Sequence, residues 1–284
     1  MKKSIILTSF LISSAATSVA IASENIQLIT QPMTTLCVNN DISSIPSGCD
    51  ERFDTIQEAL SYLDNYMIAS DATVKIEMTE APTSSYYTIY VNHPDGDKIN
   101  IEGSCGSSKC EINFKSGQNG LVVENGNKLG SLKNFAFIGK IVGDKINGIS
   151  VVNNSTIQMS EMEIYSFPQH GINVNNNSYA SIASTTIHGN GKSGVVVSRN
   201  SNIVADNVQT TANSELGFIA QYNSLLNLNG KSSAIGNGLK GTKLIVFATA
   251  VCDDGNDSEV NLAGVWQDSS VYWGDNCQNY TEEE

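Results

Sequence analysis

Positive charge is scarce in this chain. Its 284 residues include 16 lysines and arginines, only two of them arginines, against 29 acidic residues, so the formal net charge is -13. Proteins that bind nucleic acid present a basic face to the phosphates, and this composition argues against that class. Histidine is scarce too, with 3 in the chain, and no two cysteines have the spacing of zinc ligands. A zinc site is therefore not expected.

Apolar runs long enough to cross a membrane are also lacking. An apolar stretch does cover residues 5–16. It follows two lysines and precedes a segment with small residues that ends at Ala22. It is too short to span a bilayer, and its surroundings have the three-part plan of a secretory signal peptide. We expect a signal peptide over residues 1–22, with Ala20 as a second cleavage point. The mature protein would be secreted or periplasmic, with no membrane insertion and, after loss of the two lysines, a net charge of -15.

The six cysteines all follow the predicted signal peptide, and an even number in an exported chain indicates disulfides. Six cysteines allow 15 pairings. Closeness along the chain favours three local ones, Cys37–Cys49, Cys105–Cys110 and Cys252–Cys277.

An internal repeat specifies the fold. Glycines recur 23 residues apart at Gly148, Gly171, Gly194 and Gly217, and each is followed six residues later by Asn-Ser. After each Asn-Ser pair, apolar and polar residues alternate over two short segments. Neither the fixed leucines nor the helix per unit of a leucine-rich repeat is present. Short alternating strands with Gly, Asn and Ser at the corners predict an all-β solenoid with three strands per coil, in which the Asn and Ser columns are structural ladders.

The start of such a rod needs cover, because an open end is an unpaired sheet edge. Apolar residues between Phe53 and Met67 are spaced by three and four, which predicts an amphipathic helix over 53–68, with Asp54 and Gln57 as its capping box. We expect this helix to cap the rod. Strands are expected near 73–78, 86–91 and 98–102, within a β-helix domain over 53–284. Residues 23–52 are expected to form an irregular arm.

Three segments of this region carry a family resemblance, namely Phe53–Leu60, Tyr87–Ile89 and Ile99–Gly103. Together they resemble the opening of pectate-lyase-like proteins, and the resemblance extends over about 53–275. It implies a right-handed parallel β-helix. It does not select an activity, because that superfamily includes polysaccharide lyases, pectin methylesterases, polygalacturonase-type hydrolases, mannuronan epimerases, phage tailspikes and non-catalytic adhesins.

Most enzyme branches of that superfamily lack their residues here. Polygalacturonase-like hydrolases use clustered aspartates, which are not found near the two His-Gly pairs. Glycosidases need two facing carboxyl groups, yet Glu161 and Glu163 are followed one coil later by Ser184 and Thr186. Methylesterases need two aspartates and an arginine on stacked strands, and Asp206 is alone in its column.

A calcium site is the only cofactor that the sequence suggests, and the signal is weak. Residues 253–257 read Asp-Asp-Gly-Asn-Asp, but the later glutamate of a calcium loop is missing and the segment lies inside the Cys252–Cys277 loop. We interpret it as a solvated loop. Arg199 at a corner is a candidate substrate-binding residue, although a solvated side chain lying along the rod explains it better.

The best cluster for chemistry follows from the 23-residue offset. Tyr165 and His188 occupy the same position in consecutive coils, so they should stack about 5 Å apart at the backbone. Lys192 and His170 should lie around the same corner. Tyrosine, histidine and a cation are the groups that a polysaccharide lyase or uronate epimerase needs, provided that the cation lowers the pKa of the tyrosine enough for it to act as a base. The alternative is an outward ring stack without chemistry.

We therefore expect a secreted β-helix protein that engages extracellular or cell-surface polysaccharide, either as a binding or adhesin-like module or as a degenerate relative of the lyases. An active lyase or epimerase that uses Tyr165, His188, Lys192 and His170 is the second hypothesis. A structural, tailspike-like or matrix component is the third. The sequence specifies neither the glycan nor an oligomeric state.

Overall fold

The computed structural model describes residues 26–39, 47–143, 145–245, 248–252, 261–263, 265–267, 272–273 and 278–280. The predicted signal peptide, the acidic segment 253–257 and Cys277 lie outside these residues.

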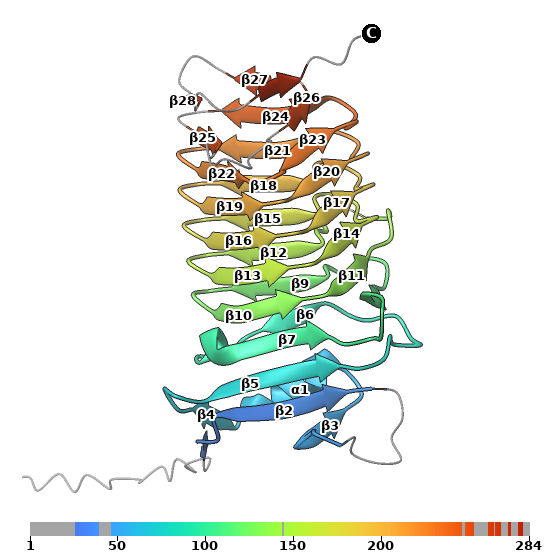
Figure 1. Ribbon diagram of the computed structural model, residues 1–284, viewed down its shortest axis with the longest axis vertical. Helices are drawn as coiled ribbons and strands as arrows, with labels where there is room; N and C mark the ends of the chain where they lie inside the picture. The colour runs from blue at the N-terminus through green and yellow to red at the C-terminus, as the bar shows by residue number, and fades with distance from the viewer. Residues whose placement is uncertain are drawn as a thin grey trace, which may run out of the picture.

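Parallel strands stacked in three long sheets form a β-helix (Figure 1). Sheet I has eleven strands, in the spatial order β3 (Glu51–Phe53), β2 (Met33–Val38), β5 (Thr73–Met78), β7 (Ile99–Gly103), β10 (Lys128–Lys133), β13 (Thr156–Ser160), β16 (Tyr179–Ala183), β19 (Asn202–Asp206), β22 (Leu225–Asn229), β25 (Thr249–Cys252) and β28 (Tyr272–Trp273).

Sheets II and III have eight strands each. Sheet II contains β8 (Cys110–Asn113), β11 (Phe135–Ile138), β14 (Glu163–Tyr165), β17 (Thr186–His188), β20 (Gln209–Thr211), β23 (Ser233–Ile235), β26 (Asn261–Ala263) and β29 (Gln278–Tyr280). Sheet III contains β6 (Ile89–Val91), β9 (Leu121–Glu124), β12 (Ile149–Val152), β15 (Ile172–Asn175), β18 (Val195–Ser198), β21 (Leu216–Gln221), β24 (Lys240–Ile245) and β27 (Val265–Gln267). Each coil runs through sheets III, I and II in turn, so the predicted fold of three strands per coil is confirmed.

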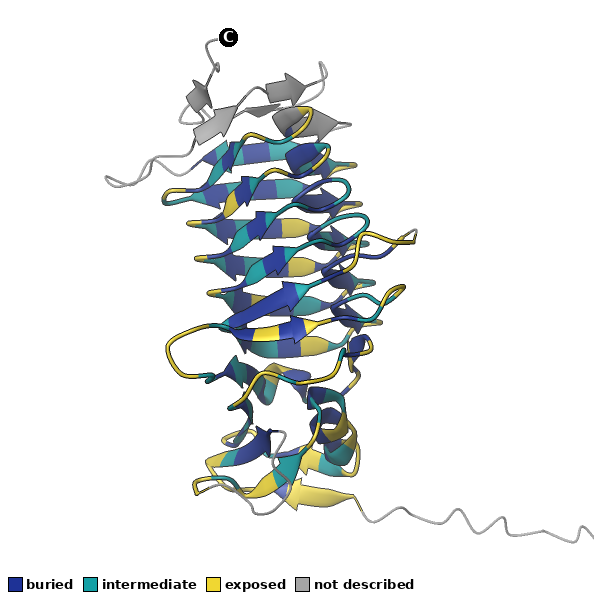
Figure 2. Cartoon of the chain, turned by 90° about the vertical axis from the view of Figure 1, so that its right-hand side faces the viewer, coloured by how far each residue is buried: buried dark blue, intermediate teal, exposed yellow. Residues whose placement is uncertain are grey.

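The core lies inside the coils because alternate residues of each strand point inward. In sheet II, for example, Ile164 and Ile187 are fully buried, while the residues on either side of them are partly exposed. Figure 2 shows exposed residues gathered at the corners between strands and at the N-terminal end. Side chains on the outward faces can therefore be replaced without disturbing the core.

The predicted glycine column is confirmed. The amide of Ile149 donates to the carbonyl of Gly171 at 2.8 Å, and the amide of Ile172 donates to that of Gly194 at 2.9 Å. A Cβ built on Gly194 would lie 2.7 Å from the carbonyl oxygen of Gly217. Glycine is needed at this corner because the coils approach more closely than a side chain allows.

The Ser column forms a buried ladder. The backbone N–H groups of Ser155, Ser178 and Ser201 each donate to the serine hydroxyl of the next coil, at 3.2, 3.1 and 3.4 Å. The asparagines that precede these serines adopt left-handed backbone, as a tight corner requires. The asparagines that form side-chain hydrogen bonds between coils are the ones one residue before these. The Nδ2 of Asn176, for example, donates to Oδ1 of Asn153 at 2.9 Å. The interpretation of the serine column as structural is thus confirmed.

Helix α1 (Ile56–Leu63) is shorter than the predicted helix over 53–68. Its N-cap is Thr55, which accepts from the amide of Glu58 at 3.1 Å, so the capping box lies one residue later than predicted. At its other end, the buried His93 Nε2 contacts the carbonyl oxygens of Leu63 and Tyr66, at 3.0 and 3.1 Å. These contacts end the helix and allow the next residues to become a strand.

That strand, β4 (Tyr66–Ile68), pairs in parallel with β1 (Gln27–Ile29). The expectation of an irregular arm over 23–52 is therefore wrong for its described part, since strands β1 and β2 lie there. Pairing of β2 with β5 over six residues extends sheet I past the helix, and β3 is its last strand. Helix α1 contacts β2, β3 and β6 instead of standing alone at the end of the rod.

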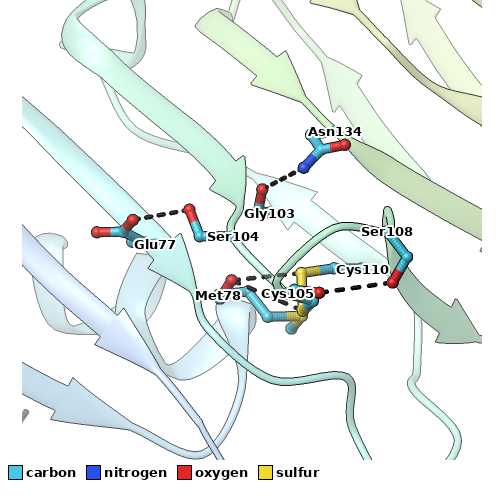
Figure 3. Close-up of a disulfide and its surroundings, with 8 residues drawn as sticks. All are labelled: Glu77, Met78, Gly103, Ser104, Cys105, Ser108, Cys110 and Asn134. Atoms are coloured by element: carbon cyan, nitrogen blue, oxygen red, sulfur yellow. Dashed lines mark hydrogen bonds between the residues drawn. A yellow bond between two sulfur atoms is a disulfide. The ribbon is translucent and has the colours of Figure 1, made fainter.

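Two predicted disulfides are present, Cys37–Cys49 and Cys105–Cys110. Figure 3 shows the second, whose Cys110 sulfur lies 3.3 Å from the carbonyl oxygen of Met78. The third predicted pair includes Cys277, which is outside the described residues. No helix among the described residues combines the length and the apolar character needed to cross a membrane.

Candidate functional site

The outward face of sheet II carries the predicted ring stack. Tyr165 of β14 pairs in register with His188 of β17, and their rings are stacked with centroids 4.8 Å apart and planes 12° from parallel. Both side chains point outward, since the intervening Ile164 and Ile187 are buried. The prediction that Tyr165 and His188 lie one above the other is confirmed.

A carboxylate holds the histidine in place. The Nε2 of His188 lies 3.0 Å from Oε1 of Glu163, and this imidazole N–H donates to the carboxylate. Glu163 comes from the same strand as Tyr165, so the three side chains form one cluster across two coils. The His188 and Glu163 side chains are 32% and 38% exposed, so a ligand can reach them.

The role of base predicted for Tyr165 does not fit its surroundings. Burial raises the pKa of the Tyr165 phenol, and the carboxylates of Glu111 and Glu163 raise it further. The lowering that a base would need was expected from Lys192, which is not among these influences. Tyr165 is therefore a neutral phenol whose ring and hydroxyl are available for contact.

His170 and Lys192 lie in the corners that follow β14 and β17. The Nδ1 of His170 accepts from the amide of Ser193 at 3.3 Å, and burial, reinforced by the nearby Lys192 charge, lowers the pKa of His170 to about 4. No hydrogen bond, ion pair or ring contact within the described chain joins His170 or Lys192 to the Tyr165–His188 stack. Direct contact among the four predicted residues thus joins Tyr165 with His188, while Lys192 acts on His170 through its charge.

Arg199 belongs to neither pair. It follows strand β18, at the end opposite the corner that holds Lys192, and its guanidinium donates to Asn175 Oδ1 at 3.3 Å. Its left-handed backbone fits the corner role shared with the neighbouring Asn200. The structure therefore places Arg199 away from the ring stack.

The sequence analysis missed one residue near the stack, Glu111. It pairs with Ala136, which pairs with Glu163, so the two glutamates share one outward column with a small residue between them. A hollow of about 350 Å³ is lined by both glutamates and Ala136, and by the disulfide loop that includes Ser108. The repeat hid this pairing because the corner before Gly148 is longer than the others and breaks the 23-residue offset.

The disulfide loop lines one side of this hollow. Figure 3 shows the loop with its disulfide and the hydrogen bonds around it. Its lower end is tied to sheet I, where the Ser104 hydroxyl donates to Glu77 Oε1 at 2.7 Å. Asn134 is bonded at both ends of the loop: its Nδ2 donates to the carbonyl of Gly103 at 2.6 Å, and its own carbonyl accepts from the amide of Cys110 at 3.1 Å. Fixed walls position side chains for recognition without a cost in loop ordering.

Within the described residues, no three histidine, cysteine, aspartate or glutamate side chains gather where they could hold a metal ion. The segment 253–257, which the sequence associates weakly with calcium, lies outside those residues.

Comparison with known proteins adds nothing to this geometry. No protein-family model matches the chain, and comparisons with curated proteins and with solved structures give no match. The parallel β-helix is therefore established by the structure alone, and the closer resemblance to pectate-lyase-like proteins stays a prediction.

Proposed function

We propose that this protein is an exported β-helix that binds glycan on the outward face of sheet II, as a binding or adhesin-like module. The observation that carries this proposal is the exposed Tyr165–His188 stack beside Glu163. Aromatic rings pack against the apolar C–H faces of sugars, while carboxylates accept charge-assisted hydrogen bonds from sugar hydroxyls. Both kinds of group are half exposed here and held by neighbours.

The charges around the stack favour a neutral glycan at this position. Glu111 and Glu163 both act on Tyr165, and no lysine or arginine pairs with the cluster among the described residues. The two carboxylates repel a uronate carboxylate placed against the stack, although Lys109 lines the hollow next to it. This weighs against the lyase and epimerase hypothesis, whose substrates carry that carboxylate next to the reacting carbon, and favours a degenerate relative over an active one.

Export is part of the proposal. Two disulfides support it, because such bonds persist in oxidising compartments and are rare in the cytosol. The signal-peptide pattern over residues 1–22 supports it independently. The mature location would be the periplasm or the extracellular space.

Hydrolysis of a glycosidic bond is a second candidate, favoured by the Glu111–Glu163 column. Two strand steps of about 4.8 Å separate their backbones by about 10 Å, close to the roughly 6.5–9.5 Å between the carboxyl groups of inverting glycosidases. In that reaction one carboxylic acid protonates the leaving oxygen and the other carboxylate activates a water molecule. New reducing ends, lost in Glu111→Gln, would establish this activity.

The binding proposal is tested with a panel of neutral and acidic polysaccharides in affinity electrophoresis, followed by calorimetry on the best ligand. We expect Tyr165→Ala to weaken binding at least about tenfold, equivalent to about 1.4 kcal/mol. Gln158→Ala, which changes an exposed residue of sheet I, is the control. The proposal would be refuted if no polysaccharide of the panel binds the protein, or if Tyr165→Ala binds with full affinity. Either result would favour a structural, tailspike-like or matrix role.

A further inference from the structure

A second site lies at the N-terminal end of the rod, where sheet II begins. A cavity of about 800 Å³ opens there between helix α1, the segment 84–88 and Lys115. This volume is within the range of roughly 300–1,000 Å³ that small-ligand sites occupy. The cavity exists because sheet II starts only at β8. Helix α1 and the segment 84–88 therefore flank a space that further strands of sheet II would otherwise fill.

Aromatic side chains make up much of its lining, namely Phe53, Tyr62, Tyr86 and Tyr87. The Phe53 and Tyr62 rings lie with centroids 5.2 Å apart, and Tyr87 is 65% exposed. Burial raises the pKa of Tyr62 and of Tyr86 to about 12, so both phenols are neutral at physiological pH. Neutral rings offer apolar surface without repelling an anion.

The cation of the cavity is Lys115. Its Nζ lies 3.5 Å from the centroid of the Tyr87 ring, and its hydrogen bond to that tyrosine and its charge lower the pKa of Tyr87. No carboxylate forms an ion pair with Lys115 among the described residues. The acid that also lines the cavity, Glu58, already accepts from the amide of Asp54 at 3.0 Å. The Lys115 ammonium group is therefore free to bind an anion, and the aromatic rings next to it can pack against a ring of the same ligand.

We propose that this cavity binds a sugar ring that carries one anionic substituent, a carboxylate, sulfate or phosphate. The ring packs against Tyr87 and Tyr62, and the anionic group meets Lys115. The hydroxyls of Ser61 and Ser85 at the rim supply hydrogen bonds to the remaining sugar hydroxyls. The chemistry is opposite in charge to that of the Tyr165–His188 stack, where carboxylates dominate.

The two sites lie along one edge of the rod. A parallel bridge joins Tyr86 to Phe114, the residue after β8. In the adjacent row, one residue earlier, Asn113 pairs with Ile138, and Ile138 pairs with Tyr165. Three strand steps of about 4.8 Å therefore separate the cavity from Tyr165, about 14 Å in all. One oligosaccharide could contact both. This connection rests on the proposed function of the stack, whereas the cavity site does not.

The cavity is tested with four small probes, D-glucuronate, D-glucose 6-sulfate, D-glucose 6-phosphate and D-glucose, by saturation-transfer difference NMR on the mature protein. We expect the preferred anionic sugar to bind at least about tenfold more tightly than glucose, since a charge-assisted bond replaces a neutral one. Lys115→Gln should remove most of that difference, and Tyr87→Ala should weaken every probe. Lys231→Gln, which changes an exposed lysine in the corner after β22, is the matched control and should change nothing.

Three results would overturn the cavity site: equal binding of all four probes, no effect of Lys115→Gln, or binding of inorganic sulfate as tight as that of the sugar sulfate. The connection is tested separately with oligosaccharides that end in the preferred unit. Tyr165→Ala should weaken the oligosaccharide and leave the monosaccharide unchanged. If Tyr165→Ala changes neither while Lys115→Gln weakens both, the proposed function of the stack fails and the cavity site stands. If Lys115→Gln changes the binding of neither ligand while Tyr165→Ala weakens the oligosaccharide, only the cavity site fails.

Discussion

The substitution Gly171→Ala tests whether neighbouring coils approach too closely for a side chain at the glycine column. The backbone of Gly171 is outside the left-handed region, so alanine can adopt its dihedral angles. The added Cβ, however, would collide with Cγ2 of Ile187 and lie 2.8 Å from the carbonyl oxygen of Gly194. Neither atom can move freely, because one is packed in the core and the other belongs to the backbone of the next coil. The cost is therefore purely one of space.

The expected loss of stability follows from two opposing effects. Overpacking a filled core costs about 1–3 kcal/mol. Replacing glycine by alanine also restricts the unfolded chain, which returns about 0.4–1 kcal/mol. The two ranges combine to a net destabilisation of about 0–2.6 kcal/mol, or about 1.3 kcal/mol at their midpoints. At roughly 2–4 °C per kcal/mol for a domain of this size, the midpoint value lowers the melting temperature by about 3–5 °C.

Chemical denaturation followed by circular dichroism measures this loss, and a double-mutant cycle identifies its cause. Ile187→Ala removes the Cγ2 atom that the new methyl group meets, so the double variant should be more stable than the sum of the two single effects by at least about 0.5 kcal/mol. Ile187→Val keeps Cγ2 and should give no such relief. Wild-type stability in Gly171→Ala, or strict additivity with Ile187→Ala, would refute the reasoning.

Three further perturbations have defined outcomes. Because burial beside a lysine lowers the pKa of His170 to about 4, below its ordinary value of 6.5, the unfolded chain takes up this proton first as the pH falls. Stability should be complete above pH 6.5 and decline by about 3 kcal/mol between pH 6.5 and 4, and melting curves of His170→Asn should lack most of that decline. Ser178→Ala leaves a buried N–H of the adjacent coil without its acceptor and should cost about 1–3 kcal/mol in urea denaturation, whereas the outward Ser181→Ala should cost under about 0.5 kcal/mol. Thr55→Ala removes the N-cap of α1 and should cost about 1 kcal/mol by the same measurement, with the exposed Ser61→Ala on that helix as a neutral comparison.

The repeating part of the fold could be predicted because each coil solves the same problem with the same residues. A glycine is needed where coils approach closely, a serine where an orphan N–H must be satisfied, and inward apolar residues at every second position. Each coil has these requirements at the same positions, 23 residues apart. The column of Gly148 to Gly217 and the stack of Tyr165 on His188 could therefore be predicted from the repeat length alone. The count required no knowledge of contacts.

Prediction failed where the spacing changes or where a contact comes from far along the chain. The helix ends early because His93, thirty residues away, binds the carbonyl of Leu63. Strand β2 forms because β5 offers a partner, although the local sequence has no repeat signal. Glu111 escaped notice because two irregular coils separate it from Glu163. The pKa of Tyr165 is raised by burial and by those same carboxylates, and the direction of this shift was therefore missed too.

These failures coincide with the sites proposed for function, and the coincidence has a physical cause. A regular coil presents a narrow outward face and tight corners, so it has no room for a cavity or a wall. The hollow beside Glu111 needs the disulfide loop, and the aromatic cavity needs a corner without strands of sheet II. Recognition surfaces on this rod therefore arise where the repeat is interrupted, near its N-terminal end. The regular coils above them contribute rigidity and, through Tyr165 and His188, one outward stack that the core can support without adjustment.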